Sequence, residues 1–146
     1  MQDITDRTSL ALRLAQVARA VNGCLAEPLA AGGLSLDQYR VLLQLADGEG
    51  HAMADVALGA LIPAPTLTRV VDRLVNGGLL HRRVDPLDRR RVLLFLSHRG
   101  RPVLRQVQLA EEELQQRIEA RLGVADLGRL VDDLDRLERC VDGGDS

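Results

Sequence analysis

The sequence predicts a mostly helical fold of the α+β class with one short hairpin. Its 146 residues are enough for one domain with a sizeable core, and too few for two ordinary domains. Tyr39 and Phe95 are the only aromatic residues, so the core must be aliphatic. Hydrophobic residues make up 46% of the chain, and the heavy use of Leu, Ala and Val favours packed helices over a sheet sandwich.

A net charge of −2 hides an uneven distribution. All 19 basic residues are Arg, which a GC-rich genome explains without any structural cause. Residues 62–105 hold ten Arg and three acidic residues, a net charge of +7, whereas the rest of the chain carries −9. This polarity indicates a DNA-facing lobe and a separate acidic scaffold.

Helical periodicity begins near the N-terminus. A first helix is predicted from about Asp6 to Ala30, ended by a Gly pair. Its apolar stripe consists of Leu10, Leu14, Val17, Val21 and Cys24. Ser35, followed three residues later by Gln38, has the pattern of a capping box and predicts a second helix ending near Asp47.

Two further helices are expected in the basic centre. A short one spans about Met53 to Ala60, and a second spans about Pro65 to Asn76, where Pro suits a first helical position. The second helix separates its faces cleanly. Its apolar face holds Leu67, Val70, Val71 and Leu74, and its outer face holds Thr66, Arg69, Arg73 and Asn76. Gly77 and Gly78 are expected to supply the left-handed end of this helix.

A hairpin follows the two Gly residues. Residues 79–84 and 91–96 predict its strands, and the tip between them is rich in Arg and turn residues. Leu93 and Phe95 fall where alternation would place polar side chains, so they either form an apolar patch on the hairpin or pack on another helix.

The remainder of the chain predicts two long helices. Ser97 is a candidate cap for a helix that begins near His98 and breaks at Gly123. The apolar stripe of the last helix consists of Leu127, Leu130, Leu134, Leu137 and Val141. Residues 143–146 are expected to fray.

This order of elements is that of a winged helix-turn-helix inside a frame of terminal helices. Three segments resemble the MarR family of bacterial and archaeal transcriptional regulators: LSLDQYRVLLQLAD (34–47), PTLTRVVDRLVNGGLLHRR (65–83) and DPLDRRRVLLFLSHRGR (85–101). The resemblance covers roughly the central half of the chain. It implies a mostly α (α+β) fold in which the N- and C-terminal helices form a dimerisation region.

Under this resemblance, residues 1–33 form an N-terminal dimerisation helix, residues 34–100 a winged helix-turn-helix DNA-binding domain, and residues 101–146 the C-terminal dimerisation helices. The small winged domain cannot cover every apolar stripe of the terminal helices, so a symmetric homodimer is also expected on physical grounds. Two recognition helices about one DNA turn apart would read an inverted repeat in double-stranded DNA.

The resemblance also implies a function, that of a sequence-specific repressor released by a small molecule. The helix at 65–76 would enter the major groove, and the hairpin at 79–96, the wing, would enter the minor groove. Asp88 and Arg90 match the family's Asp-x-Arg element, in which the Asp fixes the guanidinium of the groove-binding Arg. The candidate DNA-binding residues are Thr66, Thr68, Arg69, Arg73, Arg82, Arg83, Asp88, Arg89 and Arg90, with Arg91 as a further phosphate contact.

Family members often bind small aromatic or phenolic effectors in a cleft between the dimer helices and the DNA lobe. The residues that would bind an effector here are unknown. The chain also departs from the family pattern, because Leu61 to Ala64 replace a Gly turn followed by Ser or Asp, and one N-cap hydroxyl is lost. This departure keeps open a rival function, a winged-helix protein-interaction module with weak DNA binding.

Other classes of protein find little support. Cys24 and Cys140 form no CxxC pair and are expected to be buried structural thiols, with a thiol-based redox-sensing regulator as the alternative. The His residues lack ligand spacing, so no metal or cofactor is expected. No catalytic motif predicts an enzyme. Without a membrane span or a signal sequence, we expect a cytoplasmic protein.

Overall fold

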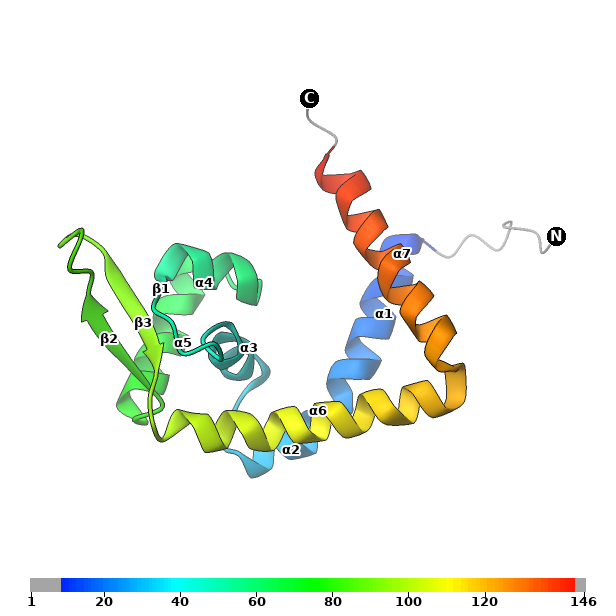
Figure 1. Cartoon of the computed structure of the whole chain (residues 1–146), viewed down its shortest axis with the longest axis horizontal. Coiled ribbons are helices and arrows are strands. Elements are labelled where there is room, and N and C mark those ends of the chain that lie inside the picture. The colour runs from blue at the N-terminus through cyan, green and yellow to red at the C-terminus, as the bar shows by residue number, and fades with distance from the viewer. Residues whose placement is uncertain (1–8, 144–146) are drawn as a thin grey trace. The chain divides into compact units, whose positions relative to one another are not determined.

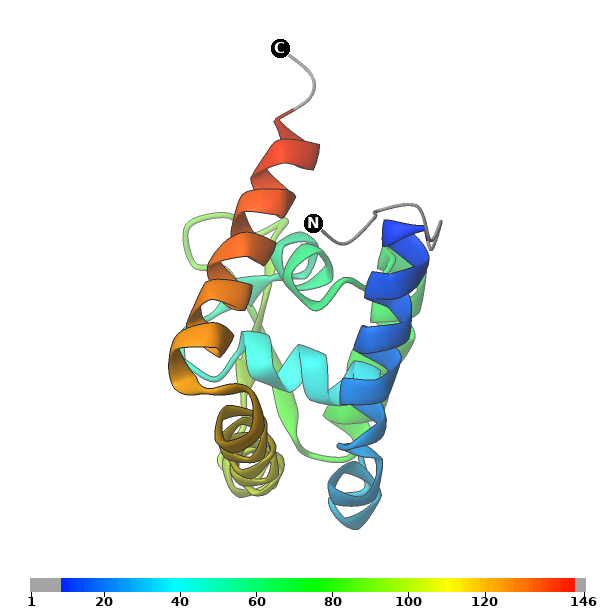
Figure 2. The ribbon, with the colours of Figure 1, turned by 90° about the vertical axis from the view of Figure 1, so that its right-hand side faces the viewer.

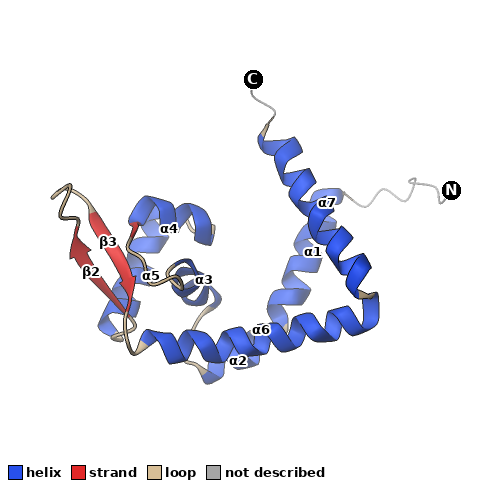
Figure 3. Cartoon of the chain, in the orientation of Figure 1, coloured by secondary structure: helices blue, strands red, loops and turns tan. Residues whose placement is uncertain are grey.

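The computed structural model describes residues 9–143. The chain divides into two compact units, residues 1–109 and residues 110–146. The elements, in chain order, are α1 (Leu10–Gly23), α2 (Ala26–Ala31), α3 (Leu36–Gln44), β1 (His51–Ala52), α4 (Met53–Ala60), α5 (Ala64–Asn76), β2 (Leu80–Val84), β3 (Val92–Leu96), α6 (Gly100–Leu122) and α7 (Val124–Asp142) (Figures 1 and 3). The predicted α+β class is therefore confirmed.

The first predicted helix is wrong in one respect, because it is two helices set at an angle (Figure 2). The chain turns after Asn22 and Gly23, which have low helix propensity. The turn allows Leu25 and Leu29 to be buried, at 3% and 5% exposure, whereas α1 contains no buried residue. Burial of these two leucines thus overrides the continuous periodicity of the sequence. Residues 6–8 of the predicted helix lie outside the described residues.

A compact helical core lies in the middle of the first unit. Helix α3 packs on α4 and α5, and α5 also packs on β2. The side chains that are almost completely buried come from these elements and from β3 and α6: Val41, Leu42, Leu45, Val56, Leu67, Val71, Leu74, Leu94 and Val107. This aliphatic core fixes the α4–α5 pair and holds the outer face of α5 toward solvent.

A three-stranded antiparallel sheet borders this core (Figure 3). The strand order is β1-β3-β2, with Leu80 opposite Leu96 and Val84 opposite Val92 in the β2–β3 hairpin. The predicted hairpin is thus observed. The two-residue strand β1, which pairs His51 with Leu94, was not predicted, because so short a strand carries no periodicity of its own.

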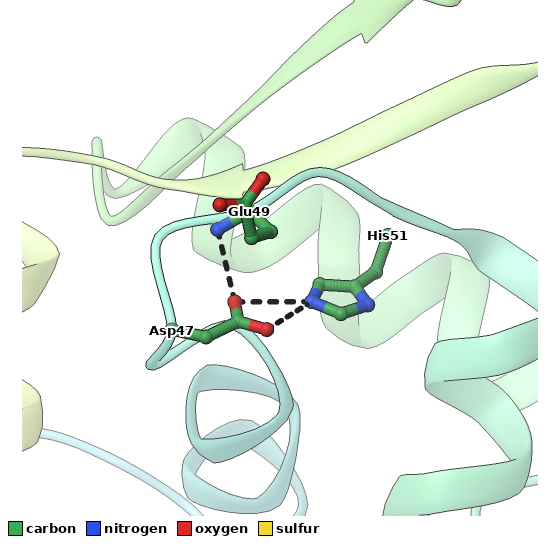
Figure 4. Close-up of polar contacts among 3 residues, drawn as sticks. All are labelled: Asp47, Glu49 and His51. Atoms are coloured by element: carbon green, nitrogen blue, oxygen red, sulfur yellow. Dashed lines mark hydrogen bonds and ion pairs between the residues drawn. The ribbon is translucent and has the colours of Figure 1, made fainter.

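The turn between α3 and β1 is held by a small polar cluster (Figure 4). The Asp47 carboxylate accepts a hydrogen bond of 2.9 Å from the backbone N–H of Glu49 and lies 2.8 Å from Nε2 of His51. These two contacts, the backbone N–H first, hold the pKa of Asp47 below its ordinary value of 3.8. The cluster links the turn after α3 to β1, the strand that pairs with β3 of the hairpin.

The predicted helix ends agree with the structure at several points. Ser35 and Gln38 form the complete capping box of α3. Gly78 has a φ of 73°, which an L-residue adopts only with strain, and it follows the end of α5 as expected. Ser97 accepts a hydrogen bond of 2.9 Å from the N–H of Gly100 at the start of α6. Gly123, with φ 94°, separates α6 from α7.

Within residues 9–143, no single helix has both the length and the apolar composition needed to cross a membrane. Helices α4 and α5, which meet at a 103° bend, satisfy the criterion only when taken together, by length and composition alone.

Candidate DNA-binding surface

Helix α5 is strongly two-sided. Leu67, Val70, Val71 and Leu74 are buried on its inner side, as the sequence predicts. On the opposite side Thr68, Arg69 and Arg73 are exposed and Thr66 is half-buried. The inner stripe anchors the helix, so its guanidinium groups project from a fixed backbone. A helix of this kind fits the major groove of B-DNA, which is about 12 Å wide.

The start of α5 carries the departure noted in the sequence. Pro63 occupies the N-cap position and makes no side-chain capping bond. The Thr68 hydroxyl donates a hydrogen bond of 3.2 Å to the Ala64 carbonyl one turn earlier, so its proton is used inside the helix. Because no side chain caps this end and Pro65 has no N–H, the N–H groups that an anionic partner such as a DNA phosphate would meet here are those of Ala64 and Thr66.

The residue that ends α4 has a costly backbone conformation. Leu61 adopts the left-handed region at φ 57° and ψ 43°, which favours glycine. Its side chain is 78% exposed, and Leu58 beside it is 79% exposed. Leu61 therefore gains little from burial to offset the strain of its backbone.

The tip of the wing is ordered by its own aspartates. Asp85 accepts a hydrogen bond of 2.9 Å from the N–H of Leu87, and Asp88 accepts one of 3.0 Å from the N–H of Arg90. The N–H of Asp85 also donates to the carbonyl of Arg91 across the tip, at 2.8 Å. These bonds give the turn a defined shape from which Arg89 and Arg90 project into solvent. Asp88 thus orders the backbone of Arg90.

Two arginines of the wing form ion pairs with the helices. Arg82 donates to the carboxylate of Asp72 on α5. Arg91 lies 3.5 Å from Asp55 on α4. Both pairs link the wing to the helix-turn-helix, and they occupy two guanidinium groups that the sequence assigned to DNA phosphates.

On the outer face of the sheet, Phe95 contacts residues of the neighbouring strand and of the turn before β1 rather than forming an open apolar patch. His81 pairs with Phe95 across the hairpin, and their rings stack at a centroid distance of 5.4 Å and an angle of 7°. The guanidinium carbon of Arg83 lies 5.2 Å from the centre of the same ring. A Cβ atom on Gly50 would collide with the ring end. Phe95 is therefore covered within the sheet and forms no open patch there.

All the residues proposed from the sequence for DNA binding lie in the first unit, and all are exposed except Thr66. The structure places Thr66, Thr68, Arg69 and Arg73 on α5, Arg82 and Arg83 on β2, and Asp88, Arg89 and Arg90 in the tip of the wing. Their contacts with DNA remain predictions. Sequence reasoning missed the role of Phe95, which the strand register brings next to Arg83. It also missed that of Asp72, which the packing of α5 on β2 brings next to Arg82.

The prediction of two buried thiols is wrong. Cys24 and Cys140 are both exposed in the single chain. Cys24 directly follows α1, whose apolar stripe is not covered within the described chain, and its Sγ lies 3.4 Å from the Ala20 carbonyl. Among residues 9–143, no group of three or more His, Cys, Asp or Glu side chains could hold a metal ion.

Known proteins match this arrangement. The model of the MarR family matches residues 32–91. A transcriptional regulatory protein assigned to the hcr operon of Thauera aromatica is 30% identical over 107 residues, which cover 73% of this chain. The chain spans only 64% of that relative's length.

Several solved structures match over nearly the whole chain. The transcriptional regulator PA4135 is 31% identical, with a TM-score of 0.83 and coverage of 91% of this chain and 98% of that one. NadR in complex with 4-hydroxyphenylacetate is 28% identical, with a TM-score of 0.81 and coverage of 94% and 97%. The repressor CouR bound to a 23-mer DNA duplex is 26% identical, with a TM-score of 0.80 and coverage of 89% and 92%.

Proposed function

We propose that this chain, which belongs to the MarR family, is a dimeric, sequence-specific DNA-binding repressor that a small molecule releases from its operator. The observation that carries the proposal is the two-sided helix α5. Its apolar side is buried, while Arg69 and Arg73 project from the other side with Thr68. The likeness to CouR, solved on a DNA duplex, supports the same function.

In the proposed complex, α5 occupies the major groove and the wing reaches the adjacent minor groove. Arg69 and Arg73 meet base edges or phosphates, because Arg presents a planar fork of donors. Arg90 enters the minor groove, where narrow A·T-rich stretches concentrate negative potential. The hydrogen bond from its N–H to Asp88 supports this role, since an ordered turn loses less entropy on binding.

The dimer is the second part of the proposal. Helices α1 and α7 each contain no buried residue. Leu10, Leu14, Val17 and Val21 of α1 are exposed, and so are Leu130, Leu134 and Val141 of α7. We propose that a second copy of the chain covers these stripes, with residues 1–33 and 101–146 as the dimerisation regions. Two α5 helices would then read an inverted repeat.

A small effector completes the proposal. NadR was solved with 4-hydroxyphenylacetate, which supports a small aromatic or phenolic effector for this chain as well. Such a molecule can shift the protein away from its DNA-binding form only by binding the other form more tightly. The proposed activity is one of binding rather than of catalysis, and it takes place in the cytoplasm, where the chromosome of a bacterium or archaeon lies.

The experiment that tests the repressor function is selection from a library of random 30-base-pair duplexes, followed by titration of the recovered sequences by fluorescence anisotropy. We expect inverted repeats with half-site centres about one helical turn apart, bound roughly a thousandfold more tightly than unrelated DNA. Equal affinity for selected and unrelated DNA would favour the interaction module and refute the repressor.

The effector is tested on the same complex. We expect 4-hydroxyphenylacetate, or another member of a panel of aromatic and phenolic acids, to raise the melting temperature of the free protein and to weaken its affinity for the selected duplex. The control is an aliphatic acid of similar size. A panel in which no compound changes either quantity would contradict this part of the proposal.

A further inference from the structure

We propose that the Phe95 ring is a positioning residue that holds the Arg83 guanidinium ready for a phosphate of the DNA backbone. The inference rests on the proposed DNA-binding function and adds to it a residue that does not itself touch DNA. It concerns the outer face of the sheet, where Phe95 lies between Gly50 of the turn before β1 and His81 of β2.

The strand register creates this arrangement. Strand β3 lies between β1 and β2, and Phe95 is opposite His81. Arg83 is opposite Leu93, so it is the diagonal neighbour of Phe95 on the same face. Residues two positions apart along a strand point to the same face, and a long Arg side chain reaches this diagonal neighbour.

The ring is held on two sides. On one side it stacks nearly parallel to His81, at 7°. On the other side it lies so close to Gly50 that a Cβ atom there would meet three of its ring carbons. The absence of a side chain at Gly50 is therefore what leaves room for the ring at this position. A ring fixed in this way is a platform of defined orientation.

Arg83 lies over this platform. Its guanidinium carbon is 5.2 Å from the ring centre, within the range of a cation–π contact, and the residue itself is exposed. The contact restricts a side chain that otherwise samples many rotamers, while its N–H groups remain able to donate to an anion. An arginine restrained before binding loses less entropy when it contacts a phosphate.

The neighbouring wing arginines differ from Arg83 in this respect. Arg82 is paired with Asp72 and Arg91 lies near Asp55, so a carboxylate already neutralises each of them. The cation–π contact restrains Arg83 without neutralising it. Compared with Arg82 and Arg91, Arg83 is therefore the better prepared for a phosphate. A phosphate contact carries no base information, so its loss should weaken binding equally for all sequences.

The test is a double-mutant cycle measured on the selected duplex. We expect Arg83→Ala to weaken binding about tenfold and to lower the salt slope by roughly 0.9, because one fewer counterion is released. Phe95→Leu should weaken binding about threefold, the size of an exposed cation–π contact. Combined with Arg83→Ala, Phe95→Leu should cost nothing more. The matched control is Arg89→Ala, whose effect should simply multiply with that of Phe95→Leu, because Arg89 lies in the wing turn.

Two further measurements guard against a general loss of structure. Gly50→Ala should displace the ring and reproduce the Phe95→Leu effect in the presence of Arg83, but not in its absence. In NMR spectra of the free protein, the Arg83 side-chain protons should show a ring-current shift that Phe95→Leu removes.

The outcomes separate this inference from the function on which it rests. Wild-type protein without selective DNA binding would overturn both. If the wild type binds DNA selectively, but Phe95→Leu leaves the affinity unchanged or lowers it equally with and without Arg83, only the role of Phe95 is overturned. A missing ring-current shift would also overturn it.

Discussion

Helices α5 and α7 are both amphipathic, but only α5 has its apolar face buried within the chain. In α5 four apolar residues are buried against the chain's own core, and the exposed arginines Arg69 and Arg73 face solvent. In α7 no residue is buried, and charges pair along the helix, as Arg129 does with Asp126 at 2.7 Å. An amphipathic helix thus offers to a partner whichever face its own chain leaves uncovered. Helix α5 offers cations, and α7 offers an apolar stripe.

The largest expected effect comes from placing a charged residue in the apolar stripe of α7. Leu134→Asp should convert the dimer to a monomer, because a carboxylate would be buried in the interface. Affinity for the inverted repeat should fall about a hundredfold, since two linked half-sites bind far more tightly than one. Sedimentation equilibrium and anisotropy titration measure the two effects.

Glu138→Gln is the matched control for that substitution, because it changes an exposed polar position on the same helix. It should leave both mass and affinity unchanged. A Leu134→Asp protein that stays dimeric would show that α7 does not cover a second copy, and the contrast with α5 would lose its meaning.

A smaller effect should follow from releasing an arginine on the DNA-facing side. Asp72→Asn removes a negative charge from α5 and frees Arg82 from its ion pair. We expect affinity to rise about threefold at low salt, with the salt slope steeper by roughly 0.9. Asp126→Asn releases Arg129 on α7 instead and should leave DNA binding unchanged. Weaker binding by Asp72→Asn would mean that the ion pair is needed to hold the wing in place.

A substitution in the turn before α5 should change the stability of the protein rather than its affinity for DNA. Leu61→Gly should raise the free energy of unfolding by about 1 kcal/mol, because Gly adopts the left-handed region without strain. For a chain of this size that is about 3 °C in melting temperature. The control is Leu58→Gly, a helical position of equal exposure, which should lose about 1 kcal/mol. A Leu61→Gly protein less stable than wild type would show that the exposed Leu61 side chain makes a stabilising contact.

The smallest effect concerns the polar cluster that supports the wing. Since the pKa of Asp47 is lower in the folded protein than its ordinary 3.8, the unfolded chain binds the proton more tightly. Its contribution to stability is present above 3.8 and is lost as the pH falls through the lower folded value. Urea unfolding from pH 6 down to about pH 2.5 should therefore show wild type and Asp47→Asn converging in acid. A constant difference across this range would contradict the assignment.

Much of this molecule follows from local sequence signals. The capping box at Ser35, the two faces of α5 and the break at Gly123 were all predicted, because each depends on a few adjacent residues. The helix period also predicted that Arg69 and Arg73 lie on the outer side of α5, and both are exposed there.

What could not be predicted depends on residues that are distant in the chain. The contact of Phe95 with Gly50 and His81 depends on the register of three strands, and β1 is too short to be recognised from sequence periodicity. The split of the first helix at Cys24 could not be predicted, because it depends on the burial of Leu25 and Leu29 against residues distant in the chain. Burial of the thiols was predicted from a stripe that the single chain leaves uncovered.

We propose that α5 and the wing bind DNA while the terminal helices hold two copies together. The most direct test is the variant Arg69→Ala/Arg90→Ala, measured for mass by sedimentation and for affinity on the selected duplex. We predict an intact dimer whose affinity falls by a hundredfold or more, since each lost groove contact costs about 1–3 kcal/mol. An intact dimer that binds the duplex as tightly as the wild type would contradict the account.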